Sequence, residues 1–276
     1  MQEKKFDLRE DEYLGKDGLP YCKNCHTPRA VYLKEFDRYV PSACKCRREA
    51  YEREERETRL RERRMKVEEF RRNSALGKHF ADCSFATARI TANNQKVYEM
   101  CKNYCKHVSE MLKAGVGAYI YGVPGVGKTH LTACMGNALT DELHTVLFTS
   151  FVEIECQLKD FFGNNSAQSA ILRRAETVDF LFLDDIGTEN IKVGTGWLQT
   201  IAFDLINTRI NAKKPIIYSS NYRIADIMTK CNYEERTAHR IRGSCLFEQQ
   251  LDCENMRDFI LQQNKNKLMK FINGGN

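Results

Sequence analysis

The sequence predicts an α/β protein built on a parallel sheet. A glycine-rich loop, Gly122 to Thr129, separates an apolar run at 118–121 from an apolar-periodic stretch at 130–139. A second apolar run, 178–183, ends in two aspartates. From about residue 75 onward, such runs alternate with helical patterns. Short runs that are apolar throughout are typical of central parallel strands, which are buried on both faces.

Length and composition set outer limits on the protein. The chain has 276 residues, enough for one sizeable core and a small appendage, and its net charge of +6 permits nucleic-acid contact without requiring it. The sequence contains no run of about 18 apolar residues, so it predicts no membrane span. The first residues do not resemble a signal peptide. We therefore expect a cytoplasmic protein that does not contact membranes. In that compartment, twelve cysteines favour thiols or metal ligands over disulfides.

Changes in composition near residues 46 and 75 predict three segments. Residues 1–46 hold four cysteines and are interpreted as a small zinc-binding domain that contacts a partner. Residues 47–74 lack Gly and Pro and predict a charged helical linker. Residues 75–276 carry the alternating apolar runs and predict the α/β domain.

The four N-terminal cysteines predict a structural zinc site. Cys22 and Cys25 form one pair, Cys44 and Cys46 form another, and 18 residues lie between the pairs. Two close thiolate pairs at such a separation match a tetrahedral Zn²⁺ site. The intervening stretch can form a hairpin with a strand at 30–33. His26 is a possible substitute ligand, although four thiolates already fill the site. Among the other cysteines, Cys101 and Cys105 are more consistent with core thiols than with a second metal site, and Cys134 with packing.

The segment from Arg47 to Arg72 predicts one long helix. Glutamates precede arginines by four residues at several positions, including Glu49 with Arg53 and Glu52 with Arg56. A solvated spacer is the simpler interpretation, and an Arg-rich surface that touches nucleic acid or a partner is the alternative. Because Glu nearly balances Arg, the composition does not favour a phosphate-binding arm.

The glycine-rich loop has the strand–loop–helix context of a nucleotide phosphate site. Glycines allow backbone N–H groups to surround an anion, and the helix that follows adds a partial positive charge. Lys128 is expected to reach the β- and γ-phosphates of ATP or GTP, and Thr129 to hold Mg²⁺ through its hydroxyl. The residues expected to contact the nucleotide are Gly122, Pro124, Gly125, Val126, Gly127, Lys128, Thr129 and His130.

Polar residues at the ends of two further strands complete the expected site. Asp184 is expected to orient Mg²⁺ through water, and Asp185 to polarise the attacking water. A strand opened by Pro215 ends at Ser219, Ser220 and Asn221. Ligands lie outside the carboxyl ends of strands in open α/β sheets, so Asn221 is a candidate sensor of the water or the γ-phosphate.

With these motifs in order, the chain resembles AAA+ ATPases of the bacterial helicase-loader group, the DnaC/DnaI type, over about residues 75–265. The motifs that carry the resemblance are 122–129, 180–187, 197–209 and 214–221. The IstB transposition helper ATPases share them but usually lack the four-cysteine segment. The Asp184-Asp185 pair, where most AAA+ proteins have Asp-Glu, is frequent in the loader clade. The shorter side chain of Asp185 suits slow hydrolysis.

The resemblance implies five parallel strands in the order 5-1-4-3-2, at about 118–122, 145–149, 179–184, 215–220 and 245–250. It also implies that an arginine reaches the ATP of a neighbouring subunit, with Arg240 preferred over Arg236, whereas a solvated basic helix face is the alternative. Arg257 matches the segment whose arginine touches the phosphates within one subunit. Cys253 stands in that region, where related chains often have Gly, so the register of the match is open.

The resemblance further implies binding of single-stranded DNA between the second and third strands. Cations and aromatic rings serve such binding. The candidates are Lys159, Phe161, Phe162, Arg173 and Arg174, with the arginines preferred because the phenylalanines also suit a core or an interface. The implied function is ATP-dependent loading of a DnaB-type hexameric helicase onto single-stranded DNA, with self-association through the ATPase domain. The alternatives are a transposition helper ATPase and a non-catalytic adaptor that binds ATP only structurally.

Overall fold

The computed structural model describes residues 6–72, 80–160, 165–188 and 197–256, together with positions 258, 261, 262, 265 and 269. The chain divides into two compact units, Met1–Met65 and Lys66–Asn276. Among the described residues, no helix combines the length and the apolar character needed to cross a bilayer.

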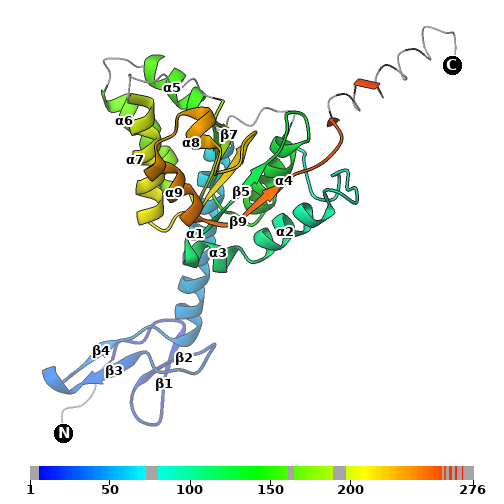
Figure 1. Ribbon diagram of the computed structural model, residues 1–276. Helices are drawn as coiled ribbons and strands as arrows, with labels where there is room; N and C mark the ends of the chain where they lie inside the picture. Colours follow the sequence, from blue (N-terminus) through cyan, green and yellow to red (C-terminus); the bar gives the residue numbers. More distant parts are fainter. Residues whose placement is uncertain are drawn as a thin grey trace. The chain divides into compact units, whose positions relative to one another are not determined.

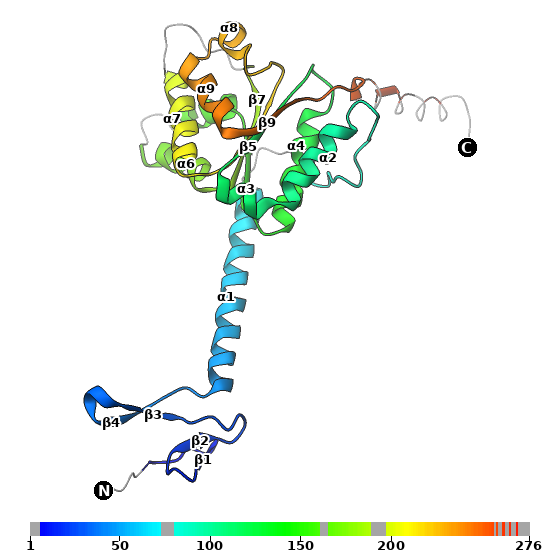
Figure 2. The same ribbon diagram turned by 60° about the horizontal axis from the view of Figure 1, so that its bottom comes forward.

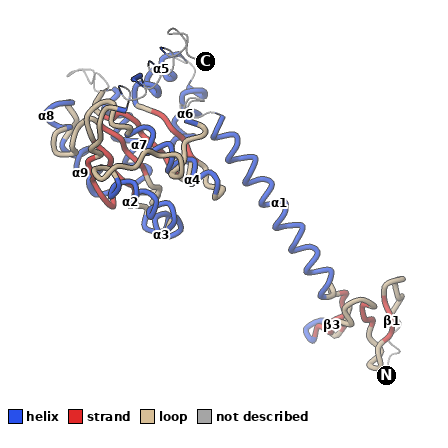
Figure 3. Tube along the Cα trace, turned by 90° about the vertical axis from the view of Figure 1, so that its right-hand side faces the viewer, coloured by secondary structure: helices blue, strands red, loops and turns tan. Residues whose placement is uncertain are grey.

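The N-terminal unit consists of two small hairpins and the first part of a long helix (Figure 3). Strands β1 (Glu12–Leu14) and β2 (Pro20–Cys22) pair antiparallel. Strands β3 (Ala30–Leu33) and β4 (Arg38–Pro41) pair across the short 3-10 helix η1 (Lys34–Phe36). The predicted strand at 30–33 is therefore confirmed.

Helix α1 spans Lys45–Arg72 and confirms the predicted charged helix, which begins two residues earlier than expected. Ion pairs four residues apart stabilise it locally: Arg59 lies 2.6 Å from Glu55, and Arg72 lies 3.2 Å from Glu68. Each such exposed pair contributes only about 0.3–0.5 kcal/mol. In the last turns Val67 and Phe70 are buried, and Phe70 belongs to the core of the C-terminal unit.

A five-stranded sheet forms the centre of the C-terminal unit (Figure 1). Its strands are β5 (Gly117–Tyr121), β6 (Val146–Thr149), β7 (Phe180–Ile186), β8 (Ile216–Ser220) and β9 (Cys245–Gln250), in the order β6-β7-β8-β5-β9. All neighbouring strands are parallel. When these five strands are numbered 1 to 5 in chain order and read from β9 to β6, this is the predicted order 5-1-4-3-2. Each observed strand overlaps a predicted one.

Helices cover both faces of the sheet, so the strands are buried on two sides. On one face lie α2 (Gln95–Lys106), α3 (Val108–Ala114) and α4 (Lys128–Asp141) (Figures 1 and 2). On the other lie α5 (Phe151–Asp160), α6 (Asn165–Thr177), α7 (Trp197–Asn211), α8 (Ile227–Cys231) and α9 (Glu235–Ser244). Along β7, Phe180 and Phe182 join the first core, whereas Leu181 and Leu183 join the second. This alternation explains the continuous apolar run in the sequence.

Two further features of the core bear on the sequence predictions. Cys101, Cys105 and Cys134 are buried, and the first two belong to the core beneath α2, as expected of packing thiols. Arg209, in α7, is also fully buried. Its guanidinium donates to the carbonyls of Ala175, Val178 and Pro215 at 2.7–2.9 Å. Arg209 thereby joins the end of α6 to the starts of β7 and β8.

Candidate functional site

The predicted phosphate loop lies at the carboxyl edge of the sheet, between β5 and the start of α4. Gly125 and Gly127 have φ angles of +89° and +92°, which residues with a Cβ rarely adopt. A Cβ on Gly122 would lie 2.4 Å from the carbonyl oxygen of Leu251, and one on Gly125 would lie 2.4 Å from Oδ1 of Asn255. The loop therefore needs glycine both for its conformation and for the close approach of the chain after β9.

Lys128, the first residue of α4, is held inside this loop. Its side chain is only 6% exposed, and its ammonium group donates to the carbonyl of Gly122 at 3.0 Å and to that of Val123 at 3.3 Å. A third bond, of 2.8 Å, goes to Oδ1 of Asn221 at the end of β8. The structure thus brings together two residues that the sequence placed 93 positions apart.

A second cluster joins α4 to the ends of β7 and β8. The Thr129 hydroxyl donates to Oδ2 of Asp184 at 3.0 Å, and the Ser219 hydroxyl donates to Oδ1 of the same carboxylate. The Ser219 oxygen in turn accepts the backbone N–H of Asp185 at 3.0 Å. The sequence singled out Asp184, Asp185 and Thr129, but it gave Ser219 no role beyond its place at the strand end.

Asp185 has an unusual backbone conformation, with φ at +53°. The pairing of β7 with β8 shifts register between Leu183 and Ile186, so the strand bulges at this point. Bulges re-aim side chains, and strained residues often mark functional positions. Asp185 lines two adjoining cavities.

The larger cavity, of about 640 Å³, runs over the phosphate loop. Pro124 to His130 form one wall, and Asp185 and Asn221 lie at the end that faces the sheet. The remaining lining residues come from outside the phosphate loop: Phe80, Thr87, Arg89, Asn94 and Tyr98 belong to no recognisable motif, and Cys253 and Met256 belong to the segment after β9. Burial lowers the pKa of His130, whose Nδ1 lies 3.3 Å from the Tyr98 hydroxyl. Burial thus favours the neutral imidazole at this position.

The chain after β9 closes over the loop and supports this wall. The N–H of Leu251 donates to the Tyr121 carbonyl at 2.7 Å, and the N–H of Met256 donates to the Gly125 carbonyl at 2.8 Å. Arg257, the predicted phosphate contact within one subunit, lies outside the described residues.

The second cavity, of about 420 Å³, adjoins the first. Thr129, Asp184 and Asp185 line it, together with Thr149, Ser150 and Glu153 from the end of β6 and the start of α5. Glu153 was not singled out in the sequence, because its helix position carries no motif. The two cavities share Phe80, Thr129 and Asp185, and the last two are the residues expected at the reacting end of a nucleotide.

The chemistry of these groups fits a nucleoside triphosphate with Mg²⁺. The cavity over the loop is large enough for a nucleotide, the loop supplies a lysine at a helix N-terminus for phosphates, and Thr129 and Asp184 supply the hard oxygen ligands that Mg²⁺ prefers. Asp185 faces the cavities as a carboxylate that can accept a proton.

The two arginines expected to act on a neighbouring subunit lie on α9 and line neither cavity. Both are exposed. The Arg236 guanidinium is bonded to Glu234 and stacks 4.3 Å above the Phe203 ring. Arg240 lies one helical turn further along.

The candidate DNA contacts lie around α5 and α6. Lys159 is exposed and pairs with Glu155 at 2.6 Å. Arg173 is exposed, whereas Arg174 is half-buried. Phe161 and Phe162 lie outside the described residues.

The four N-terminal cysteines converge on one point. Their Sγ atoms all lie within 4.8 Å of one another, with 3.6 Å between Cys22 and Cys46 and 3.3 Å between Cys44 and Cys46. A tetrahedral Zn²⁺ with bonds of about 2.3 Å needs sulfur atoms roughly 3.8 Å apart, so the set fits zinc. His26 contacts the Tyr13 hydroxyl at 3.1 Å instead of joining the cluster.

Local hydrogen bonds adapt these thiols to metal binding. The Thr27 hydroxyl lowers the pKa of Cys25 to about 5, and the Cys25 backbone N–H and the Arg29 guanidinium lower that of Cys22. Hydrogen bonds to the neighbouring sulfur atoms, Cys44 first and then Cys22 and Cys25, raise the pKa of Cys46 to about 12. Zn²⁺ binding displaces that proton, because the metal ligand is the thiolate.

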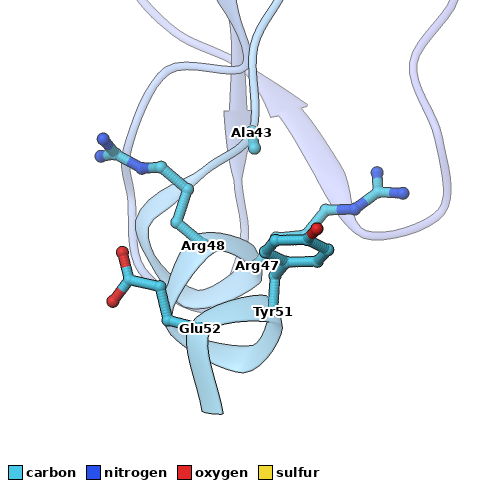
Figure 4. Close-up of a pocket in the computed structure, with 5 residues that line it drawn as sticks. All are labelled: Ala43, Arg47, Arg48, Tyr51 and Glu52. Carbon is cyan, nitrogen blue, oxygen red and sulfur yellow. The ribbon is translucent and has the colours of Figure 1, made fainter. Parts of the chain in front are cut away.

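A shallow hollow of about 230 Å³ lies next to the cysteine cluster, at the start of α1 (Figure 4). Figure 4 shows Arg47 beside Tyr51, and Arg48 on the opposite side of the helix with Glu52. Tyr51 is 67% exposed. Arg47 and Tyr51 thus form an accessible surface at the start of α1, as the partner-contact alternative requires.

The strand order, the phosphate loop and the Thr129–Asp184 cluster define a P-loop nucleotide-binding protein of the AAA+ fold. Comparison with known families agrees with this class. Residues 48–230 match the family of IstB-like ATP binding proteins, and the chain belongs to that family.

Relatives with assigned names are distant. The replicative helicase loader DnaI of Bacillus subtilis is 27% identical over 168 residues, which cover 55% of this chain and 53% of DnaI. The replicative helicase loader DnaC of Escherichia coli is 26% identical over 178 residues, covering 63% and 66%. The chain thus spans about half to two thirds of the length of these relatives.

Several solved structures have a similar fold. The crystal structure of DnaI has a TM-score of 0.55 at 19% identity and covers 66% of this chain and 95% of that one. The DnaC helicase loader gives 0.56 at 19% identity, with coverages of 64% and 100%. The replication initiator DnaA bound to AMPPCP and single-stranded DNA gives 0.55, also at 19%, with coverages of 70% and 56%.

Proposed function

We propose that the chain is an ATP-dependent loader that places a hexameric replicative helicase on single-stranded DNA. The observation that carries the proposal is the alignment of its ATPase unit with DnaI and DnaC, both named replicative helicase loaders. A complete set of nucleotide-site residues and a four-cysteine module ahead of a long helix support it.

In this proposal each residue at the sheet edge has a defined task. Lys128 and the loop N–H groups bind the phosphates, Thr129 and Asp184 hold Mg²⁺, and Asp185 accepts the proton of the attacking water. Mg²⁺, when bound, neutralises charge on the phosphates. Asn221 keeps Lys128 aligned until a phosphate replaces it. Arg240, in a neighbouring copy, completes the site on assembly, so that ATP binding favours the assembled state and hydrolysis favours release.

The N-terminal module, residues 1–46, is proposed to bind the helicase, with zinc held by Cys22, Cys25, Cys44 and Cys46. Zinc there has a structural role, because four thiolates leave no open coordination position. Arg173 is the proposed first contact with single-stranded DNA, since its guanidinium is exposed on α6.

The competing function is a transposition helper ATPase. The match of residues 48–230 to the family of IstB-like ATP binding proteins supports it. Both functions use the same nucleotide site and differ in the client. A direct comparison of clients therefore separates them. A third possibility, an adaptor that binds ATP without hydrolysing it, predicts that Asp185→Ala, which keeps the phosphate loop and Lys128, retains full function.

The test is co-purification of the full chain with a DnaB-type helicase and, separately, with an IS21-type transposase, with ATP and with ADP. We expect a stable complex with the helicase and none with the transposase. We expect the Cys22→Ser variant not to form the helicase complex. Cys156→Ser is the matched control, because Cys156 is exposed on α5 and far from the cluster in sequence. Binding to the transposase alone would overturn the loader assignment.

A further inference from the structure

Glu153 occupies a position between the nucleotide site and helix α6. It lies in the first turn of α5, immediately after β6. Its backbone N–H donates to the Ser150 hydroxyl at 3.1 Å, which fixes the start of the helix. The half-buried side chain lines the 420 Å³ cavity together with Thr129, Asp184 and Asp185. A carboxylate outside the known motifs therefore faces the reacting end of the site.

The same side chain lines a second, much smaller cavity on its other side. This space of about 20 Å³ lies between β6, α5 and α6, and Gln157 and Arg174 also line it. It can hold about one water molecule. Gln157 donates to Oε1 of Glu153 at 3.3 Å. Glu153 thus lines both the 420 Å³ cavity and a small space that Arg174 also lines.

Arg174 is the unusual member of this second cavity. Its Nη2 atom is buried and has no hydrogen-bond partner among the described residues. A buried donor of a charged group without an acceptor is costly. Burial also raises the pKa of Glu153, so its negative charge is costly where it now lies. A contact between the two side chains would relieve both costs.

We propose that Glu153 is a positioning residue whose side chain turns from the 420 Å³ cavity toward Arg174 when a γ-phosphate enters. The binding of a triphosphate is thereby coupled to the position of α6. A γ-phosphate is a negative charge in the cavity that Glu153 lines, and like charges at short range repel. Arg174, which lines the small cavity together with Glu153, offers a favourable partner for the displaced carboxylate. ADP lacks the γ-phosphate and leaves the carboxylate in place. The pairing of Glu153 with Arg174 would pull on α6, the helix that also carries Arg173.

This inference rests on the proposed function only in that the loop binds ATP with its γ-phosphate beside Asp184. The test compares dissociation constants of ADP and of a non-hydrolysable ATP analogue, each with Mg²⁺, for the full chain. Glu153→Gln removes the repelling charge and keeps the size. It is expected to raise the preference for the analogue over ADP about three- to tenfold. Arg174→Gln is expected to lower that preference by a similar factor, because the carboxylate then has no alternative partner.

The double variant makes the test specific to the pair. With Glu153 neutral, Arg174 has no charge to receive, so Glu153→Gln/Arg174→Gln should behave like Glu153→Gln alone. Arg174→Lys should retain most of the wild-type preference. Glu155→Gln is the matched control, since Glu155 lies on the same helix and pairs with Lys159. Melting temperatures of all variants identify any that fail to fold.

Each result has one consequence. Unchanged preferences in both single variants, or additive effects in the double variant, overturn the coupling and leave the nucleotide site intact. Failure of the wild-type chain to bind either nucleotide overturns the proposed ATP site and the coupling together. If the wild-type chain binds the nucleotides but does not hydrolyse ATP, the ATPase proposal alone is overturned. The coupling between Glu153 and Arg174 is measured by nucleotide affinity and does not depend on hydrolysis.

Discussion

Lys128 and Asn221 are bonded to each other across the sheet edge, with 2.8 Å between Nζ and Oδ1. The lysine begins α4, and the asparagine follows β8, which is the neighbour of β5 in the sheet. The bond therefore connects the phosphate loop to the strand that also carries Ser219. It fixes the position of the ammonium group, and from this bond we predict that Asn221 aligns Lys128.

Asn221→Ala should reduce ATP hydrolysis about 10- to 100-fold, the effect of losing one hydrogen bond to a charged group. Nucleotide affinity should fall much less, because the loop N–H groups remain. Steady-state kinetics and equilibrium binding measure the two effects separately. Lys113→Ala, an exposed lysine on α3, is the control. Equal losses in affinity and in turnover would contradict the alignment role.

Ser219 connects the two acidic residues, since its hydroxyl donates to Asp184 and accepts the N–H of Asp185. Ser219→Ala should lower turnover about tenfold and raise the Mg²⁺ concentration needed for half-maximal activity, because Asp184 loses a fixed partner. Titration of Mg²⁺ at saturating ATP measures this. Ser219→Thr keeps the hydroxyl and serves as the matched variant. A normal Mg²⁺ requirement in Ser219→Ala would show that Thr129 alone positions Asp184.

The sequence was most informative where a local pattern defines a local structure. The glycine loop needs positive φ angles at Gly125 and Gly127, and the apolar runs need burial on both faces, so the strands and the loop were predictable. The sheet order came from the resemblance to AAA+ proteins and was confirmed. The convergence of the four cysteines also followed from their spacing.

What the sequence could not supply depends on contacts between distant segments. Asn94, Tyr98 and Cys253 reach the nucleotide cavity only because α2 and the chain after β9 pack beside the loop. Glu153 belongs to a helix with no motif, and its two cavities exist only once β6, α5 and α6 are packed. Arg209 could have been a surface residue of α7, and its burial follows from the five backbone carbonyls around it.

The cysteine cluster predicts about one zinc ion per chain. Cys44→Ser should lose most of this metal, because three thiolates bind Zn²⁺ more weakly than four, and the small N-terminal unit should lose structure with it. The melting transition of the C-terminal unit should stay unchanged, since it has its own core. Metal analysis and calorimetry of the full chain test both points. Cys156→Ser should retain the zinc, and a metal-free but folded N-terminal unit in Cys44→Ser would contradict the structural role.

Arg209 is predicted to stabilise the C-terminal unit and not to act in catalysis. Arg209→Met keeps the length of the side chain but leaves buried carbonyls without donors, so the free energy of unfolding should fall by about 3–5 kcal/mol. Denaturant unfolding measures the change. Arg242→Met, an exposed arginine on α9, should change stability by less than about 0.5 kcal/mol. A loss of turnover in Arg209→Met without a loss of stability would indicate a different role.

The two arginines of α9 make different predictions, because their surroundings differ. Arg236 is bonded to Glu234 and stacks on Phe203, so its guanidinium is engaged within its own subunit. Arg240 is exposed, as a residue that acts on a neighbouring copy must be. Arg240→Ala should therefore lower hydrolysis by about 1,000-fold, the effect of an arginine that stabilises charge in the transition state. Arg236→Ala should lower stability instead and affect turnover much less.

Mixing two inactive variants tests whether Arg240 acts between subunits. Lys128→Ala chains lack a working phosphate site but carry Arg240, whereas Arg240→Ala chains have the reverse defect. If Arg240 completes the site of a neighbour, equal mixtures should recover a substantial part of wild-type hydrolysis, because Arg240 from one chain then faces ATP bound by the other. Mixtures of Lys128→Ala with an Arg240→Ala chain that also carries Asp185→Asn should recover none, which controls for chance reactivation. Activity in neither mixture, with both variants folded and assembled, would assign Arg240 to the solvated face of α9.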